Sequence, residues 1–333
     1  MKILQPNMTR RQTLAAAGAG VLAASLGRIR PAAAALEPIR QGYQTNMWGM
    51  PTYYLMHSGH LEKHGLKYQD FAVPSGNLTM QQMVARQVDL GTYAGPSLLL
   101  GYDKGGLVGV AQIETVGKTA AVVVRKDLGI KKVEDLRGKK IANQTGSSVG
   151  NVFVDQIMPA HGLKPGDYQE VRMNVDDMVA ALVAKTVDAM VNVEPYNAIA
   201  EADGIGVSVV DYSGFDKMPV FMAATPDFVQ KAPDTIIAYL KAWLDVANDF
   251  KRQPDKVADV IYSFYTSKGY QMSKETFKKA LAKVEVNPGF PPESELMPYM
   301  KHHAEELVAT KKIKPIADLS KVFVRDFMAK AQA

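Results

Sequence analysis

QMVARQVDLGTYAGP (residues 82–96) is repeated, with changes, as ALVAKTVDAMVNVEP (residues 181–195), ninety-nine positions further along the chain. The tetrapeptide HGLK also occurs twice, at residues 64–67 and 161–164, in the same order and at nearly the same offset. The identical positions of the two longer stretches are Val84/Val183, Ala85/Ala184, Val88/Val187, Asp89/Asp188 and Pro96/Pro195. This duplication predicts a chain that folds as two lobes of one design.

Each copy of the repeat predicts the same local structure. Apolar residues three and four apart, at positions 80, 83 and 84 and again at 178, 181 and 182, indicate an amphipathic helix. The short apolar run after each Asp indicates a buried strand, which the Pro ends because it cannot donate to a sheet ladder. In open α/β sheets, ligands bind at the carboxyl ends of the strands. Two such edges facing each other predict a ligand-binding cleft.

The rest of the chain fits an α/β fold around this repeat. Lobe one is expected to comprise residues 36–122 and 223–333, and lobe two residues 123–222. We expect the apolar runs 119–124 and 219–224 to be strands that cross between the lobes. The last hundred or so residues have a helical pattern and are expected to pack on lobe one. Lengths of this kind are ordinary for two domains of one chain.

The positive charge of the chain is concentrated in its first 35 residues. The formal net charge is +5, but this segment holds five basic side chains and no acidic one, so the remainder has 39 − 5 = 34 basic against 34 acidic residues. The five are Lys2, Arg10, Arg11, Arg28 and Arg30. A neutral remainder gives no reason to expect nucleic acid as a partner.

Residues 1–35 also have the parts of an export signal. A basic start precedes the weakly apolar run 13–26 and an Ala-rich end at 32–35, a run too short to span a membrane. TRRQTL at residues 9–14 favours the twin-arginine route over the general one. The chain has no cysteine, which excludes a disulfide, a thiolate site and a lipid-anchored N-terminus. We therefore expect a soluble periplasmic protein.

Two loops carry features of a small-molecule site. Trp48 lies in a loop after the first predicted strand, where a flat apolar ring beside Asn46 suits a pocket wall. Gly146, Ser147 and Ser148 follow a predicted strand and open a helix, an arrangement that binds anions through backbone amides. The loop after the second strand offers Ser75 and Asn77, for which helix capping is an equally good interpretation.

Several segments together resemble the substrate-binding proteins of nitrate/sulfonate/taurine ABC importers, a group that includes NMT1/THI5-like binders of thiamine-pyrimidine precursors. The segments are residues 43–51, VDLGTYAGPS (88–97), VVVRKDLGIKKVEDLRGKKIA (122–142), the helix start at 146–148, HGLKPGDY (161–168) and VDAMVNVEPY (187–196). The resemblance covers residues 36–330. It implies a type II periplasmic-binding-protein fold with two crossing hinge strands, and lobes that close on the ligand by a hinge motion.

The resemblance also implies which residues bind the ligand. The expected contacts are Asn46, Met47, Trp48, Ser75, Gly76, Asn77, Tyr93, Ala94, Thr145, Gly146, Ser147, Ser148, Asn174, Glu194 and Tyr196. It implies a monomer without cofactor or metal, which delivers its ligand to the permease and ATPase subunits of an importer. A ligand-sensing subunit of a membrane receptor is the alternative partner arrangement.

The expected ligand is a small organic molecule with an acidic end, an organosulfonate or a similar carboxylate. The helix start at Gly146 favours an anion, whereas Trp48, Met47, Tyr93 and Tyr196 offer more apolar surface than nitrate could use. Glu194 suggests a donor at the far end, and no Arg or Lys is expected in the cleft loops. An aminopyrimidine is the alternative ligand.

An enzyme of the pyrimidine-synthase type on the same fold is the main rival function. Those synthases carry a cysteine-rich motif, which this cysteine-free chain lacks. The six histidines form no evident metal motif, and we interpret His302-His303 as part of a charged helix face. We therefore expect a binding protein and not an enzyme.

Overall fold

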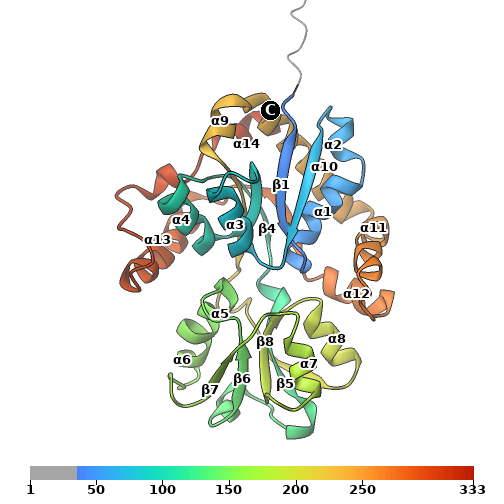
Figure 1. Ribbon diagram of the computed structural model, residues 1–333, viewed down its shortest axis with the longest axis vertical. Helices are drawn as coiled ribbons and strands as arrows, with labels where there is room; N and C mark the ends of the chain where they lie inside the picture. The colour runs from blue at the N-terminus through green and yellow to red at the C-terminus, as the bar shows by residue number, and fades with distance from the viewer. Residues whose placement is uncertain (1–35) are drawn as a thin grey trace, which may run out of the picture. The chain divides into compact units, whose positions relative to one another are not determined.

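Two β-sheets flanked by helices form the part of the chain that the structure describes, residues 36–333 of a computed structural model (Figure 1). The export-signal prediction for residues 1–35 lies outside this range. Lobe one contains the six-stranded sheet, β1 (Ile39–Gln44), β2 (Tyr68–Val73), β3 (Leu90–Ala94), β4 (Val108–Thr115), β10 (Pro219–Ala224) and β11 (Glu285–Gly289). Lobe two contains the five-stranded sheet, β5 (Ala120–Arg125), β6 (Lys140–Asn143), β7 (Gln169–Arg172), β8 (Ala189–Val193) and β9 (Gly206–Asp211).

The two sheets have the same internal order, as the sequence repeat predicts. Lobe one runs β2-β1-β3-β10-β4 and lobe two runs β7-β6-β8-β5-β9, with β11 added at the edge of lobe one. The first three strands of each series are parallel, and the fourth is antiparallel to the third. In each lobe the chain enters this fourth strand directly after a linker that comes from the other lobe. The two-lobed α/β fold is therefore confirmed.

Strands β5 and β10 are the first strands after the two passages between the lobes. Among the described residues, β5 pairs with β8 and β9 alone and β10 with β3 and β4 alone, so each lies wholly within one sheet. The passages between the sheets are the linkers 116–119 and 212–218, and the expected lobe limits at 122 and 222 fall inside the two strands. The linkers are joined because the amides of Val116 and Gly117 donate to the carbonyl oxygen of Lys217, at 3.2 and 2.9 Å.

Helices cover both sheets. Those of lobe one are α1 (Met50–His57), α2 (His60–Lys63), α3 (Gly76–Val84), α4 (Gly95–Gly105), α9 (Pro226–Lys231), α10 (Pro233–Arg252), α11 (Pro254–Ser267), α12 (Lys274–Leu281), α13 (Glu293–Ala309) and α14 (Asp326–Gln332). Those of lobe two are α5 (Ser148–Val152), the π-helix Phe153–Ile157, α6 (Met158–Ala160), α7 (Met178–Val183) and α8 (Tyr196–Ala202). No helix in residues 36–333 is long and apolar enough to cross a membrane.

The longest helix, α10, illustrates how the tail attaches to lobe one. It begins with Pro233 and Asp234 and ends with Lys251 and Arg252, charges that oppose the helix dipole at each end. Its apolar face, which includes the fully buried Trp243, packs on α1, α2, α14 and β11. The tail also contains an unexpected strand, β11, and its helix α12 contacts α8 of lobe two. The expected packing on lobe one thus holds for most of the tail.

Candidate functional site

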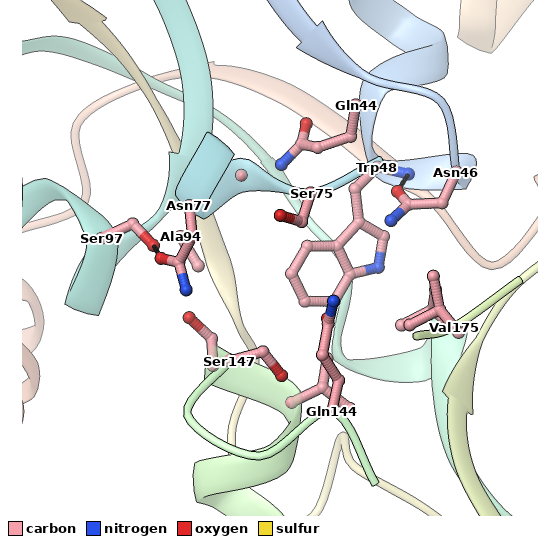
Figure 2. Close-up of a pocket in the computed structure, with 14 residues that line it drawn as sticks. Gln44, Asn46, Trp48, Ser75, Asn77, Ala94, Ser97, Gln144, Ser147 and Val175 are labelled. Atoms are coloured by element: carbon pink, nitrogen blue, oxygen red, sulfur yellow. Dashed lines mark hydrogen bonds between the residues drawn. The ribbon is translucent and has the colours of Figure 1, made fainter. Parts of the chain in front are cut away.

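A small cavity of about 40 Å³ lies where loops from both lobes meet (Figure 2). Lobe one and lobe two each supply strand ends and helix starts to its wall. The lining residues are Gln44, Asn46, Trp48, Ser75, Gly76, Asn77, Ala94, Ser97, Gln144, Ser147, Ser148, Val149, Val175 and Val193. None of these described lining residues carries a charge. We call this space the inner pocket.

Three helix N-termini reach the inner pocket, and their first residues form much of its wall. Helix α3 begins directly after Ser75, whose Oγ accepts from the amide of Leu78 at 3.4 Å, and α5 begins directly after Ser147. Helix α4 begins behind Ala94, which has no side-chain oxygen to cap it. α5 continues through the π-helix and α6, so its dipole is longer than its five residues suggest. Free amides and positive helix ends therefore converge on an uncharged space, which favours an anionic group.

Hydrogen bonds hold several pocket side chains in place. The Ser97 hydroxyl donates to Asn77 Oδ1 at 2.6 Å, and Asn77 Nδ2 lies 3.5 Å from the Gly146 carbonyl oxygen of lobe two. Gly76 permits close packing here, because a Cβ at that position would lie 2.8 Å from Gln44 Nε2 and from Tyr93 Cβ. Amide and hydroxyl groups with fixed orientations are the usual polar elements of small-molecule sites.

Trp48 forms one wall of the pocket, as the sequence predicts. Its backbone amide donates to Asn46 Oδ1 at 3.0 Å, which fixes the turn Met47–Gly49. Its indole Nε1 donates to Thr119 Oγ1 at 2.6 Å, in the linker between the lobes. The indole is buried and faces Gln144 and Val175 of lobe two (Figure 2).

A second, larger groove of about 540 Å³ adjoins the inner pocket and shares Asn77, Gln144 and Ser147 with it. Three predicted contacts, Thr145, Gly146 and Asn174, lie in this groove and not in the inner pocket. The groove also contains Arg172 and Asp177. Arg172 is the last residue of β7, and the described loop residues that line this groove include no Arg or Lys. We call this space the outer groove.

Four other predicted contacts line neither space, for packing reasons that differ between them. Met47 and Tyr93 are fully buried in the core of lobe one, and the Tyr93 hydroxyl contacts the Met83 sulfur. The Tyr196 hydroxyl lies 3.1 Å from that of Tyr270. Glu194 is fully buried and bonded within the protein, with Lys283 Nζ 2.5 Å from one oxygen and the Ala198 amide 3.0 Å from the other.

Burial and the two bonded partners of Glu194 shift its pKa in opposite directions. Desolvation raises the pKa of this carboxyl, and the nearby Lys283 ammonium and the Ala198 amide oppose that shift. Its backbone carbonyl oxygen also accepts from the Met47 amide across the lobes, at 3.1 Å. Glu194 thus joins the lobes and does not present its carboxylate to the pocket.

The structure adds residues that the sequence did not single out. They are Gln44, Ser97, Gln144, Val149, Val175 and Val193, and all except Val175 lie at or directly after a strand end or in the first turn of a helix. Gln44 ends β1 and Val193 ends β8, so the rule that strand ends carry ligand contacts would have found both. Val175 follows a loop with no distinctive pattern, and no sequence signal marks it.

The fold and the pocket between its lobes define a two-lobed periplasmic-binding-protein architecture of type II. Residues 46–257 match the model of the family described as "NMT1/THI5 like", and the chain belongs to this family. It aligns over 88% of its length with all of the alkanesulfonate-binding protein SsuA from Xanthomonas axonopodis pv. citri bound to MOPS, with a TM-score of 0.75 and 18% identity.

Of two sequence relatives, one is named as a binding protein and the other as an enzyme. A protein of Escherichia coli (strain K12) named for the binding of aliphatic sulfonates is 28% identical over 226 residues, which cover 66% of this chain and 69% of that protein. The 4-amino-5-hydroxymethyl-2-methylpyrimidine phosphate synthase of Schizosaccharomyces pombe is 22% identical over 175 residues, 48% of this chain and 50% of the synthase. The sequence relatives of this chain thus carry the names of both a binding protein and an enzyme.

Proposed function

We propose that this protein is the extracytoplasmic solute-binding component of an ABC importer, and that it captures a small organic acid between its lobes. The observation that carries the proposal is the uncharged inner pocket at the meeting point of three helix N-termini. The family membership and the sulfonate-binding relative support the transport role. The partners would be the permease and ATPase subunits at the inner membrane, and the protein would act in the periplasm as a monomer.

The size of the inner pocket supports an oxyanion head group. A cavity needs about 10–15 Å³ of free volume to hold one water. A volume of about 40 Å³ therefore accommodates roughly three water-sized groups, as many as a sulfonate has oxygens. A flat pyrimidine ring requires more space. The organic part of the ligand would then extend into the outer groove, where Arg172 and Asp177 offer both signs of charge. An organosulfonate or similar carboxylate with a polar tail fits this division.

Hinge closure is part of the proposal. The indole of Trp48, the backbone of Glu194 and the side chain of Asn77 each bond across the lobes or to a linker. A ligand that contacts both walls would favour this closed arrangement over an open one. Small-angle scattering with and without saturating ligand tests this part, with a smaller radius of gyration expected for the bound protein.

An aminopyrimidine is the alternative ligand, favoured by one specific relative, the pyrimidine phosphate synthase. Such a ring would have to stack on the face of Trp48 and displace Gln144 or Val175, which lie opposite. Synthase activity itself gains no support from the sequence, because the chain has no cysteine.

Calorimetry with matched variants tests the ligand class. We expect ethanesulfonate or taurine to bind wild type, and Ser147→Ala to weaken that binding by about tenfold, because one group at the helix start is lost. Ser273→Ala is the control: Ser147 and Ser273 both cap a helix through a 3.0 Å bond, but Ser273 caps α12 and does not line the pocket. Both variants should lose about 1 kcal/mol of stability. Binding of 4-amino-5-hydroxymethyl-2-methylpyrimidine without any response to sulfonates or carboxylates would overturn the preferred ligand.

A further inference from the structure

The cluster His302, His303 and Glu306 on α13 has the composition and spacing of a metal site. One ligand atom from each residue lies within 4.8 Å of the other two. His302 Nε2 is 3.1 Å from Glu306 Oε1, and His303 Nδ1 is 2.9 Å from Glu306 Oε2. Two imidazole nitrogens therefore face one carboxylate, an N/N/O donor set that suits Zn²⁺ and similar divalent transition metals.

Asp216 supplies the support that a ligating histidine usually has. It lies in the linker 212–218, and its Oδ2 is 3.3 Å from His303 Nε2, the nitrogen that faces away from Glu306. Its other oxygen accepts from the amide of Met218 at 2.6 Å, so the carboxylate is fixed. A carboxylate behind the second ring nitrogen orients a histidine ligand and selects the tautomer that leaves the first nitrogen free for a metal.

Asp155 of lobe two faces the same cluster. It lies in the π-helix Phe153–Ile157, a distortion that often occurs at functional sites, and it lines one groove together with His303, Glu306 and Lys312. Burial and the neighbouring Glu306 raise the pKa of Asp155, whereas Lys312 and the two histidines oppose that shift. Asp155, Asp216 and Glu306 thus place three carboxyl groups close to the two imidazoles.

The expectation of a charged helix face is only half correct here. His302 is exposed, but His303 is buried, with 4% of its side chain accessible, and is packed against the ring of Tyr299. Without a metal, a protonated His303 between Asp216 and Glu306 is a stable ion-pair arrangement, since the carboxylates raise the pKa of His303 to about 9 despite its burial. A structural ion pair is thus the alternative role for this cluster.

We propose that His302, His303 and Glu306 bind a divalent transition metal ion of the Zn²⁺ type, with Asp155 of lobe two or a water as the fourth ligand. The site would join α13 of lobe one, the linker residue Asp216 and the π-helix of lobe two. The metal site lies outside the inner pocket, and its proposal does not depend on the ligand proposed for that pocket. A metal bound here would hold the lobes together on the side of α13.

Metal binding by untagged full-length protein tests the proposal. Zn²⁺ calorimetry should show one site per chain, and Co²⁺ should give the strong visible absorption of a four-coordinate site. His302→Ala and Glu306→Gln should each weaken Zn²⁺ binding by at least about tenfold, since each removes a ligand, and Asp216→Asn by about 10–100-fold through lost orientation of His303. His302 is exposed, so its substitution should leave folding intact.

His161→Ala is the matched control, because His161 is also paired with a glutamate, at 2.9 Å from Glu134, but has no second imidazole beside it. It should bind Zn²⁺ as wild type does. Equal Zn²⁺ affinity for wild type and His302→Ala, or no binding by wild type, would overturn the proposal and leave the ion pair as the role of the cluster. Asp155→Asn distinguishes the fourth ligand: a loss of affinity supports Asp155, and an unchanged affinity supports water.

Discussion

The two copies of the sequence repeat end in opposite ways. In lobe one, β3 passes through Ala94 into α4, whose first turn has no side-chain cap and opens onto the inner pocket. In lobe two, β8 passes through Glu194 and Pro195 into α8, and the Glu194 carboxylate accepts from the Ala198 amide and pairs with Lys283. The helix start after β3 is open to the inner pocket, whereas the helix start after β8 is hydrogen-bonded within the protein.

This difference shows that a repeated motif fixes the position of a helix start but not whether that helix start is free or bonded within the protein. The residue after the strand decides which role each copy takes, because a carboxylate at this point occupies the amides and the positive helix end that an anion would need. Lobe two therefore contributes a helix start to the pocket through α5, whereas its repeated strand contributes only the side chain of Val193.

A large loss of stability should follow from removing the partner of Glu194. We expect Lys283→Met to lower the free energy of unfolding by about 3 kcal/mol, the lower end for a broken buried pair, because Lys283 is itself 38% exposed. Chemical denaturation measures this loss. The control is Lys118→Met, which breaks the exposed pair of Lys118 with Glu285 and should change stability little. Equal effects of the two variants would mean that the closed strand end of lobe two has no special energetic role.

The open strand end can be converted into a closed one. Ala94→Asp places a good helix cap at the start of α4, so stability should hold or rise, but it puts a negative charge in the inner pocket. We expect binding of ethanesulfonate or taurine to fall by about a hundredfold, since like charges in one site repel strongly. Ala94→Asn is the neutral control of the same size. If calorimetry shows the same loss for both variants, size and not charge limits the pocket, and the anion assignment is weakened.

The comparison extends to a second buried glutamate, Glu114 of β4, whose two oxygens have no hydrogen-bond partner among the described residues. Burial raises the pKa of Glu114 well above 4.5, so the folded state keeps a proton that the unfolded state releases. Wild type should therefore lose stability relative to Glu114→Gln as pH rises above 4.5, with a slope approaching about 1.4 kcal/mol per pH unit. Below pH 4.5 the two should respond alike to pH. Denaturation curves between pH 4 and 8 measure the slope, and a flat difference would contradict the neutral form.

The smallest expected effect is on ligand affinity in Glu194→Gln. Because the carboxylate is buried away from the pocket, sulfonate binding should change less than about twofold, a difference below 0.5 kcal/mol. Calorimetry under the conditions used for Ala94→Asp allows a direct comparison of the two strand ends. A tenfold loss would show that Glu194 acts on the ligand after all.

The repeat made much of the fold predictable. Its periodicity placed the helices and buried strands, and the Gly/Ser loop at Ser147 and the aromatic loop at Trp48 both reached the pocket. Strands β5 and β10 were predicted beside the passages between the lobes, but an apolar run does not reveal where the linker ends and the strand begins. Tyr93 does not line the inner pocket because side chains alternate along a strand, so Ala94 lines the pocket and Tyr93 is buried in the core. The internal pairing of Glu194 could not be predicted, because its partner Lys283 lies eighty-nine positions away in the sequence.

The bond between Trp48 and Thr119 also gives the protein a spectroscopic label of its own. The chain has two tryptophans, and Trp243 is fully buried in the core of lobe one, where its emission should not respond to events in the cleft. Trp48 is different, since its indole bonds to the linker and contacts lobe two. Separation of the lobes would expose this ring to water and shift its fluorescence to longer wavelength. Any change in emission on adding a ligand can thus be assigned to one residue, and the opening of the cleft can be followed in real time without a dye.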